Sequence, residues 1–248
     1  MTHINIERDD IELQDPYMIE GLPGIGLVGK IATDHIVEIL DMTYYAYAGC
    51  EGLPDVAVFE SGESDLKPPV RIFADEENDL LALQSEVPVS PSEANCFADC
   101  VTDWLNEVNG SPIYISGLPK SRDPSTKPDL FGVSTHQGGE KLKGVDLDPP
   151  TESGIVSGPT GALLNRAGKK KLDAVGLIVE TDPQFADPQA ARVLIEEGIN
   201  PIAGVDIDTK ELMEHAEDIR EQKRQLAKQM QEAEEDESSQ AAPVGMYQ

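Results

Sequence analysis

Apolar runs that alternate with helical segments are the feature that most constrains the fold of this chain. Residues 174–180 read AVGLIVE, a nearly continuous apolar run typical of a strand that is buried on both faces of a sheet. Helical patterns precede this run at 162–171 and follow it at 188–197. The alternation predicts an α/β fold: a single domain with a central mostly parallel or mixed sheet flanked by helices. With 248 residues, the chain is long enough to build one such core.

The same alternation extends through the first half of the chain. An amphipathic helix is predicted over 28–40, and a second one from about 90 to 110, with Ser90 or Ser92 as its cap. Short apolar runs predict the remaining strands, which are expected at 17–19, 43–48, 56–59, 70–73, 80–84, 112–116 and 131–135.

The pattern changes after residue 207, where the predicted α/β domain (1–207) ends. Residues 208–235 predict one long C-terminal helix with a heptad seam, which comprises Leu212, Ala216, Ile219, Lys223, Leu226, Met230 and Ala233. About three heptads are the lower limit for a coiled coil, so packing of this helix on its own domain is the alternative. Residues 236–248 are expected to form a flexible acidic tail.

The charge balance excludes several classes of partner. Asp and Glu number 47 against 19 Lys and Arg, which gives a formal net charge of −28. Such a surface repels nucleic acid and anionic membranes, so neither is an expected partner. It suits a cytosol of very high salt, which predicts a halophilic source, although an acidic mesophilic protein is the alternative. The sequence shows no secretory signal and no apolar run of about 18 residues, and we expect a cytoplasmic protein.

A glycine-rich loop lies between the first predicted strand and the helix at 28–40. Its sequence GLPGIGLVGK contains a G-x-G-x-x-G match, which allows a nucleotide pyrophosphate to approach backbone N–H groups. The alternative is a structural loop that makes a tight turn and close helix–sheet contacts. Glu20 favours the structural role, because small or apolar residues usually end the strand of a dinucleotide site. The residues of this low-specificity ligand site are Gly21, Pro23, Gly24, Gly26 and Gly29.

Other catalytic chemistry finds little support in the sequence. The four histidines are scattered, and with the three cysteines they do not match a zinc-binding spacing. Cys96 and Cys100 are expected to pack in the core as ordinary buried residues. No nucleophile–base pair stands out, so we expect no enzyme activity, no catalytic residue, no bound metal and no cofactor.

The last three residues, Met246, Tyr247 and Gln248, combine an apolar side chain, a tyrosine and a free carboxylate. An accidental terminus is one interpretation. The other is a docking tag, in which the aromatic ring and the carboxylate are bound in a pocket of a partner.

Two segments resemble the proteasome assembly chaperone two family of archaea and actinobacteria. The first is GLPGIGLVGKIA at 21–32, and the second is GPTGALL at 158–164, followed by the runs at 174–180 and 187–191. The resemblance implies an α/β domain that usually assembles into a homo-oligomer. It also implies that the glycine loop is a structural signature without established catalysis.

Some archaeal members of that family look like proteasome chaperones or activators with a C-terminal hydrophobic–tyrosine–any motif, which Met246, Tyr247 and Gln248 match. The resemblance therefore implies docking into pockets between α subunits of the proteasome core particle. The implied function is that of an assembly chaperone or an ATP-independent activator. Alternatives are an oligomeric scaffold or adaptor without proteasome activity, and a nucleotide-binding enzyme that uses the glycine loop.

Overall fold

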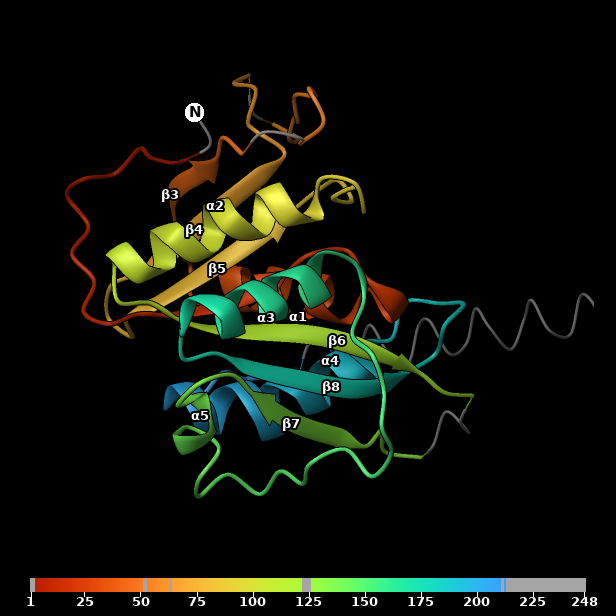
Figure 1. The fold of residues 1–248 in the computed structure, drawn as a ribbon. Helices are drawn as coiled ribbons and strands as arrows, with labels where there is room; N and C mark the ends of the chain where they lie inside the picture. The colour runs from red at the N-terminus through yellow and green to blue at the C-terminus, as the bar shows by residue number, and fades with distance from the viewer. Residues whose placement is uncertain (1–2, 51–52, 63, 122–125, 211, 213–248) are drawn as a thin grey trace, which may run out of the picture.

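The described strands form one sheet, as the sequence predicts. The computed structural model describes residues 3–50, 53–62, 64–121, 126–210 and 212. From one edge of the sheet to the other, the strands are β1 (Ile4–Ile6), β3 (Thr43–Ala48), β4 (Val70–Asp75), β5 (Leu80–Ser85), β2 (Tyr17–Gly21), β6 (Ser111–Pro119), β8 (Val175–Thr181) and β7 (Leu130–Ser134). The α/β class with a central mixed sheet is thereby confirmed (Figure 1).

The sheet has a parallel centre and antiparallel margins. Strands β5, β2, β6 and β8 run parallel to one another, whereas β1, β3 and β4 pair antiparallel on one side and β7 pairs antiparallel on the other. The central strands are the most apolar: Ile19, Ile113, Leu177 and Val179 are completely buried. A strand buried on both faces has this composition, which explains why the run at 174–180 is so informative.

Helices cover both faces of the sheet (Figure 1). Helices α2 (Ala94–Glu107) and α3 (Gly158–Lys170) lie side by side on one face, over a core that includes Phe97 and Tyr114. Helix α1 covers the other face together with the C-terminal helical segments, over a second core. These elements are α1 (Val28–Ile39), α4 (Pro188–Val193), the π-helical turn Leu194–Ile199 and α5 (Asn200–Ala203), and two short 3₁₀ turns, η1 (Ile25–Leu27) and η2 (Gly138–Glu140), complete the described helices.

Some local predictions were wrong. Residues 56–59 form no strand, because Val58 makes only an isolated antiparallel bridge with Lys67. Ser90 and Ser92 do not cap α2: their hydroxyls hydrogen-bond each other at 2.8 Å, and the helix starts at Ala94. Strand β1 was not predicted, since three residues next to an acidic segment carry too little pattern.

The cysteines depart from the expectation of independent core packing. Cys50 and Cys100 form a disulfide with a Cα–Cα distance of 6.1 Å, and both residues are buried. Cys96, one turn before Cys100 on α2, is a free and partly buried thiol. The disulfide therefore links α2 to the start of the segment that follows β3.

Only the start of the predicted C-terminal helix falls within the described residues. Leu212 is buried in the second core, and the carbonyl oxygen of Asp208 lies 2.7 Å from Nε2 of His35 on α1. The beginning of this segment thus packs on the domain. The remainder of the predicted helix and the predicted tail at 236–248 lie outside the described residues. In the part of the chain that the structure describes, none of the helices has the length and apolar character needed to span a membrane.

Candidate functional site

The glycine loop lies at the edge of the sheet where the parallel strands β2, β6 and β8 end, on the right in Figure 1. It leaves β2 at Gly21, turns through η1 and enters α1 at Val28. In parallel α/β sheets, this edge is where ligands usually bind. The location is therefore that of a binding site, and the packing of the loop determines what it can accept.

Three of the loop glycines lie against other protein atoms, so the space beside them is not open to a ligand. Gly26 has a φ of +67°, and a Cβ atom at this position would lie 2.0 Å from Oγ1 of Thr181 at the end of β8. A Cβ atom on Gly29 would lie 3.2 Å from the carbonyl oxygen of Glu20, and one on Gly21 would lie 2.6 Å from Cβ of Thr33. Only Gly24 among these loop glycines has no atom within 4 Å of such a Cβ. This geometry favours the structural role of the loop over pyrophosphate binding.

Glu20 is the central polar residue of the site. Its side chain is 1% exposed at the end of β2. One carboxyl oxygen accepts the backbone N–H of Ile115 on β6 at 2.9 Å, and the other accepts the hydroxyl of Thr160 in the first turn of α3 at 2.7 Å. Burial raises the pKa of Glu20 to about 7, although both hydrogen bonds act in the opposite direction. Glu20 thus joins three elements of the fold through one carboxyl group.

Asp187 fastens the other side of the loop. Its backbone N–H donates to the carbonyl oxygen of Gly26 at 2.9 Å, and its carboxylate accepts the N–H of Ala190 at 3.1 Å, which caps α4. The hydroxyl of Thr181 also donates to this carboxylate, at 3.2 Å. The sequence gives a signal for the cap, because an Asp–Pro pair before an apolar segment often starts a helix. Its contact with the glycine loop has no local signal and was missed.

The outer side of this edge is apolar. Ile25 and Leu27 of the loop are 44% and 42% exposed, and Leu118 at the end of β6 is 40% exposed. Lys120 and the nearly buried Glu180 form an ion pair next to them. No group of three or more His, Cys, Asp or Glu within the described ranges has the arrangement to hold a metal ion. The exposed part of this edge thus consists of apolar side chains and one ion pair.

The partner-binding residues predicted from the sequence, Met246, Tyr247 and Gln248, lie outside the described residues. The second motif, in contrast, contacts Glu20, the residue that directly precedes the glycine loop, through the hydroxyl of Thr160. The two segments that carry the sequence resemblance are therefore neighbours in space.

Comparison with known proteins matches residues 18–227 to the PAC2 family. The chain belongs to the PAC2 family. The uncharacterized protein MJ0106 of Methanocaldococcus jannaschii is 29% identical over 228 residues, which are 90% of each chain. The resemblance proposed from the two motifs is thereby confirmed.

Solved structures with the same fold extend the comparison. The crystal structure of Pyrococcus furiosus PbaA, described as an archaeal homolog of proteasome-assembly chaperone, superposes with a TM-score of 0.78 at 26% identity and covers 96% of this PAC2 chain and 97% of its own. PbaB of the same organism, described as an archaeal proteasome activator, gives a TM-score of 0.73 at 24% identity over 91% of this chain and 98% of its own. At that identity, the likeness to PbaB concerns the fold alone.

Proposed function

We propose that this PAC2 protein binds the proteasome core particle and acts as an assembly chaperone or an ATP-independent activator. The observation that carries the proposal is the match of nearly the whole chain to PbaA, combined with a C-terminal Met246-Tyr247-Gln248 sequence. A chain-wide similarity and a three-residue sequence at the end of the chain are independent, so they support the same function separately.

In the proposed mechanism, the last three residues enter pockets between α subunits of the core particle. Tyr247 and Met246 supply the buried apolar area, and the terminal carboxylate pairs with a cation of the pocket. Burial of two such side chains contributes a few kcal/mol, about 1.5–3 kcal/mol for each, so that a single tail binds weakly. Several tails on one homo-oligomer raise the affinity through effective concentration.

The proposed arrangement places a folded domain at 1–207, a long helix at 208–235 and a flexible tail at 236–248. In this arrangement the helix and the tail hold the docking residues away from the domain. The family match, which runs to residue 227, supports a helix that is a regular part of the PAC2 fold.

The proposal describes a binding protein without catalysis and without a cofactor. The packing of the glycine loop supports the absence of a cofactor, because Gly21, Gly26 and Gly29 lie in close contact with other atoms of the protein. The second candidate is an oligomeric scaffold of the same family whose tail is idle. The folded domain is the same in both candidates, so only the tail distinguishes them.

Co-purification separates these two functions. Full-length protein and a variant that lacks Met246–Gln248 are compared for their ability to retain proteasome α subunits in high salt. We expect the deletion to abolish retention and to leave the thermal stability of the domain unchanged. Equal retention by both proteins contradicts docking by the tail, and retention by neither favours the scaffold.

A further inference from the structure

All three cysteines of the chain lie at or beside the first half of α2, and the proposed function uses none of them. Cys50, which follows β3, and Cys100 on α2 form the disulfide and are only 5% and 6% exposed. Cys96, four residues before Cys100 on the same helix, is a free thiol that is partly exposed. Solvent therefore reaches the free thiol more easily than it reaches the bond.

The helix places Cys96 next to the disulfide. Residues four positions apart in an α-helix share a face, and their Cα atoms lie about 6 Å apart. Side chains on a helix also tilt toward its N-terminus, so the sulfur of Cys100 leans toward the turn that carries Cys96. The free thiol and the disulfide therefore adjoin on one face of α2.

Geometry also decides which sulfur Cys96 can bond. The Cβ atoms of helical residues four apart are about 5–6 Å from each other, whereas a disulfide brings its Cβ atoms to about 3.5–4.5 Å. A bond between Cys96 and Cys100 would therefore distort the helix. Cys50 lies outside the helix, two residues past the end of β3. Its sulfur is the one that can pair with either cysteine of α2 while the helix stays intact.

From this arrangement we propose that Cys96 and the Cys50–Cys100 disulfide form a three-cysteine exchange site, through which dissolved thiols reduce the buried bond. The Cys96 thiol loses its proton to water, and the thiolate attacks Sγ of Cys50. A bond forms between Cys96 and Cys50 as the bond to Cys100 breaks. Sγ of Cys100 leaves with the electron pair and takes up a proton. This step moves the disulfide without net oxidation or reduction.

Complete reduction requires an external reductant of the class of small thiols, such as glutathione. The external thiolate attacks Sγ of Cys96, which forms a mixed disulfide and releases Cys50 as a thiolate that takes up a proton. A second external thiolate attacks the external sulfur of the mixed disulfide, releases Cys96 and leaves the reductant as its oxidised dimer. Two electrons thereby pass from two external thiols to the protein, which ends with three thiols. Cys50–Cys100 is the resting bond, and Cys50–Cys96 is transient.

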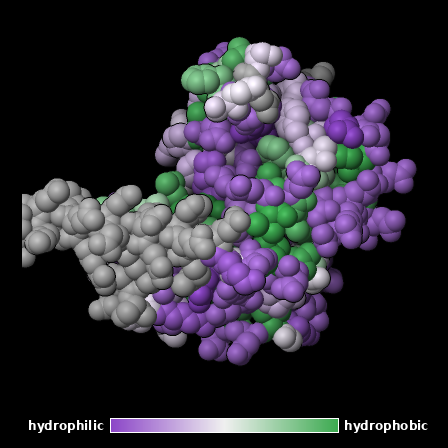
Figure 2. Space-filling view, turned by 180° about the vertical axis from the view of Figure 1, so that it is seen from behind, coloured by the Kyte–Doolittle hydropathy of each residue, from purple (hydrophilic) through white to green (hydrophobic). Residues whose placement is uncertain are grey.

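The bond controlled by this site tethers one end of the segment between β3 and β4. We refer to the described residues 53–62 and 64–69 as the β3–β4 segment; it lies at the top of Figure 1, in orange. Figure 2 shows the same projection from behind, with apolar and weakly polar atoms at its tip. Phe59 and Leu66 in this segment are 82% and 67% exposed. Reduction thus releases from α2 one end of a segment whose largest apolar side chains face solvent.

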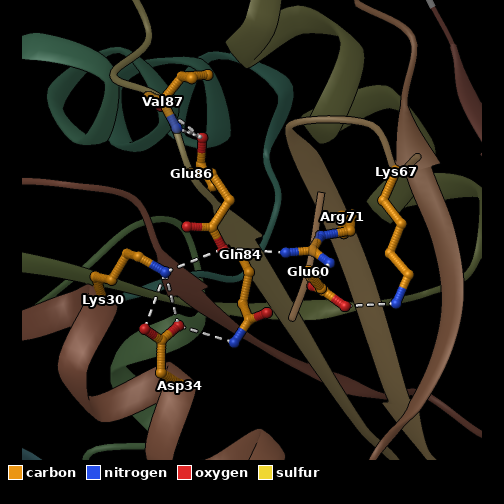
Figure 3. Close-up of polar contacts among 9 residues, drawn as sticks. Lys30, Asp34, Glu60, Lys67, Arg71, Gln84, Glu86 and Val87 are labelled. Atoms are coloured by element: carbon orange, nitrogen blue, oxygen red, sulfur yellow. Dashed lines mark hydrogen bonds and ion pairs between the residues drawn. The ribbon is translucent and has the colours of Figure 1, made fainter. Parts of the chain in front are cut away.

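Ion pairs hold the other end of the β3–β4 segment (Figure 3). Glu60 pairs with Arg71 of β4 and, at 2.6 Å, with Lys67. Arg71, whose side chain is 4% exposed, also pairs with Glu86 after β5 at 3.0 Å. Loss of either carboxylate would leave buried charge without its partner, so these contacts persist when the disulfide opens. The segment therefore has one attachment that responds to thiols and one that does not.

The first test measures how fast glutathione reduces the folded, full-length protein. Samples are quenched with an alkylating agent, and mass spectrometry counts the modified cysteines, which rise from one to three in the parent and from zero to two in Cys96→Ser. We expect the rate constant to fall at least about tenfold in Cys96→Ser, because the adjacent thiol no longer attacks the bond. Asn95→Ser changes the exposed neighbour on α2, and this matched control should be reduced at the rate of the parent.

The second test traps the alternative bond. Cys100→Ser leaves Cys50 and Cys96 as the two cysteines of the chain. After equilibration with reduced and oxidised glutathione, we expect peptide mapping to find these two residues joined within one molecule. Cys50→Ser is the control, in which Cys96 and Cys100 should form no bond with each other. Circular dichroism verifies that both variants are folded.

Three results would overturn the exchange site. Equal reduction rates for the parent and Cys96→Ser would show that dissolved thiols reach the buried bond directly. Equal slowing in Asn95→Ser would assign the effect to the helix rather than to the thiol. A folded Cys100→Ser protein without a Cys50–Cys96 bond would show that these sulfurs do not meet, and if that variant does not fold, the rate comparison decides alone. Every variant keeps the C-terminal residues, so proteasome binding is measured separately.

Discussion

Thr160 donates a hydrogen bond to the buried carboxyl group of Glu20 across 2.7 Å, which joins the first turn of α3 to the end of β2. The two residues are 140 positions apart: Glu20 directly precedes the first sequence motif (21–32), and Thr160 lies in the second (158–164). The second oxygen of Glu20 bonds the backbone of β6, so one side chain connects the glycine loop, the sheet and a covering helix. The motifs therefore encode one structural joint rather than two separate sites.

This joint predicts a specific pH dependence of stability. Burial raises the pKa of Glu20 from 4.5 to about 7, so the folded protein binds a proton that the unfolded chain has released in this interval. The stabilisation from this bound proton is fully present below pH 4.5. As the pH rises to 7 it is lost, and the free energy of unfolding falls by about 3 kcal/mol. In Glu20→Gln, where the Thr160 hydroxyl can turn to accept a hydrogen bond, this part of the pH dependence disappears. Denaturant unfolding of both proteins between pH 4.5 and 8 measures the difference, and parallel stability curves would refute a raised pKa.

The packing of the glycine loop predicts unequal effects of two alanine substitutions. Gly26→Ala combines a positive φ with a Cβ placed 2.0 Å from the Thr181 hydroxyl, and we expect a loss of about 2–4 kcal/mol of unfolding free energy. Gly24→Ala is the matched control, since a Cβ there meets no atom within 4 Å. Chemical denaturation compares the two variants. Similar stabilities for both would show that the loop is not held against β8.

The structural role of the loop also predicts the response to nucleotides. A ligand present at 100 times its dissociation constant stabilises the protein that binds it by about 2.7 kcal/mol. We expect no shift of the melting temperature with ATP, AMP or NAD at millimolar concentrations. A clear shift that is absent in Gly24→Ala would instead favour the nucleotide-binding alternative.

The disulfide predicts one free thiol in the unreduced protein. Thiol labelling after denaturation without reductant should modify Cys96 and leave Cys50 and Cys100 unlabelled. Cys100→Ser should reduce the unfolding free energy by about 2–4 kcal/mol, because the bond restricts the unfolded chain. Cys96→Ser is the control and should have a smaller effect. Three labelled cysteines in the purified protein would show that the bond is not formed.

The sequence predicts the central part of this fold well because periodicity there reflects burial. The strands β2, β3, β5, β6 and β8 and the helices α1 and α3 all lie within or close to their predicted ranges. Apolar residues at these positions contact the core, so their spacing follows the geometry of the element. The failures occur where tertiary contacts decide the structure. Val58 lies in a short apolar run at 56–59 that predicts a strand, yet it makes only an isolated bridge with Lys67.

The candidate site was predictable only in part. The glycine loop is visible in the sequence, and Glu20 at the end of β2 already argued against a nucleotide site. The partners of Glu20 and Gly26 were not visible, because Thr160, Thr181 and Asp187 come from distant parts of the chain. Local patterns identify an element, but contacts between elements depend on the whole topology.

Affinity of the tail for the α ring is the most direct test of the central claim. Equilibrium binding of the full chain to assembled proteasome core particle is measured at high salt, where long-range attraction is screened and contact at the pocket remains. Our account predicts that Tyr247→Ala weakens binding at least about tenfold, because an aromatic anchor of this size contributes about 1.5–3 kcal/mol. Substitution of the nearby Gln240→Ala should leave the affinity unchanged. Equal affinity of the parent and Tyr247→Ala would contradict the account.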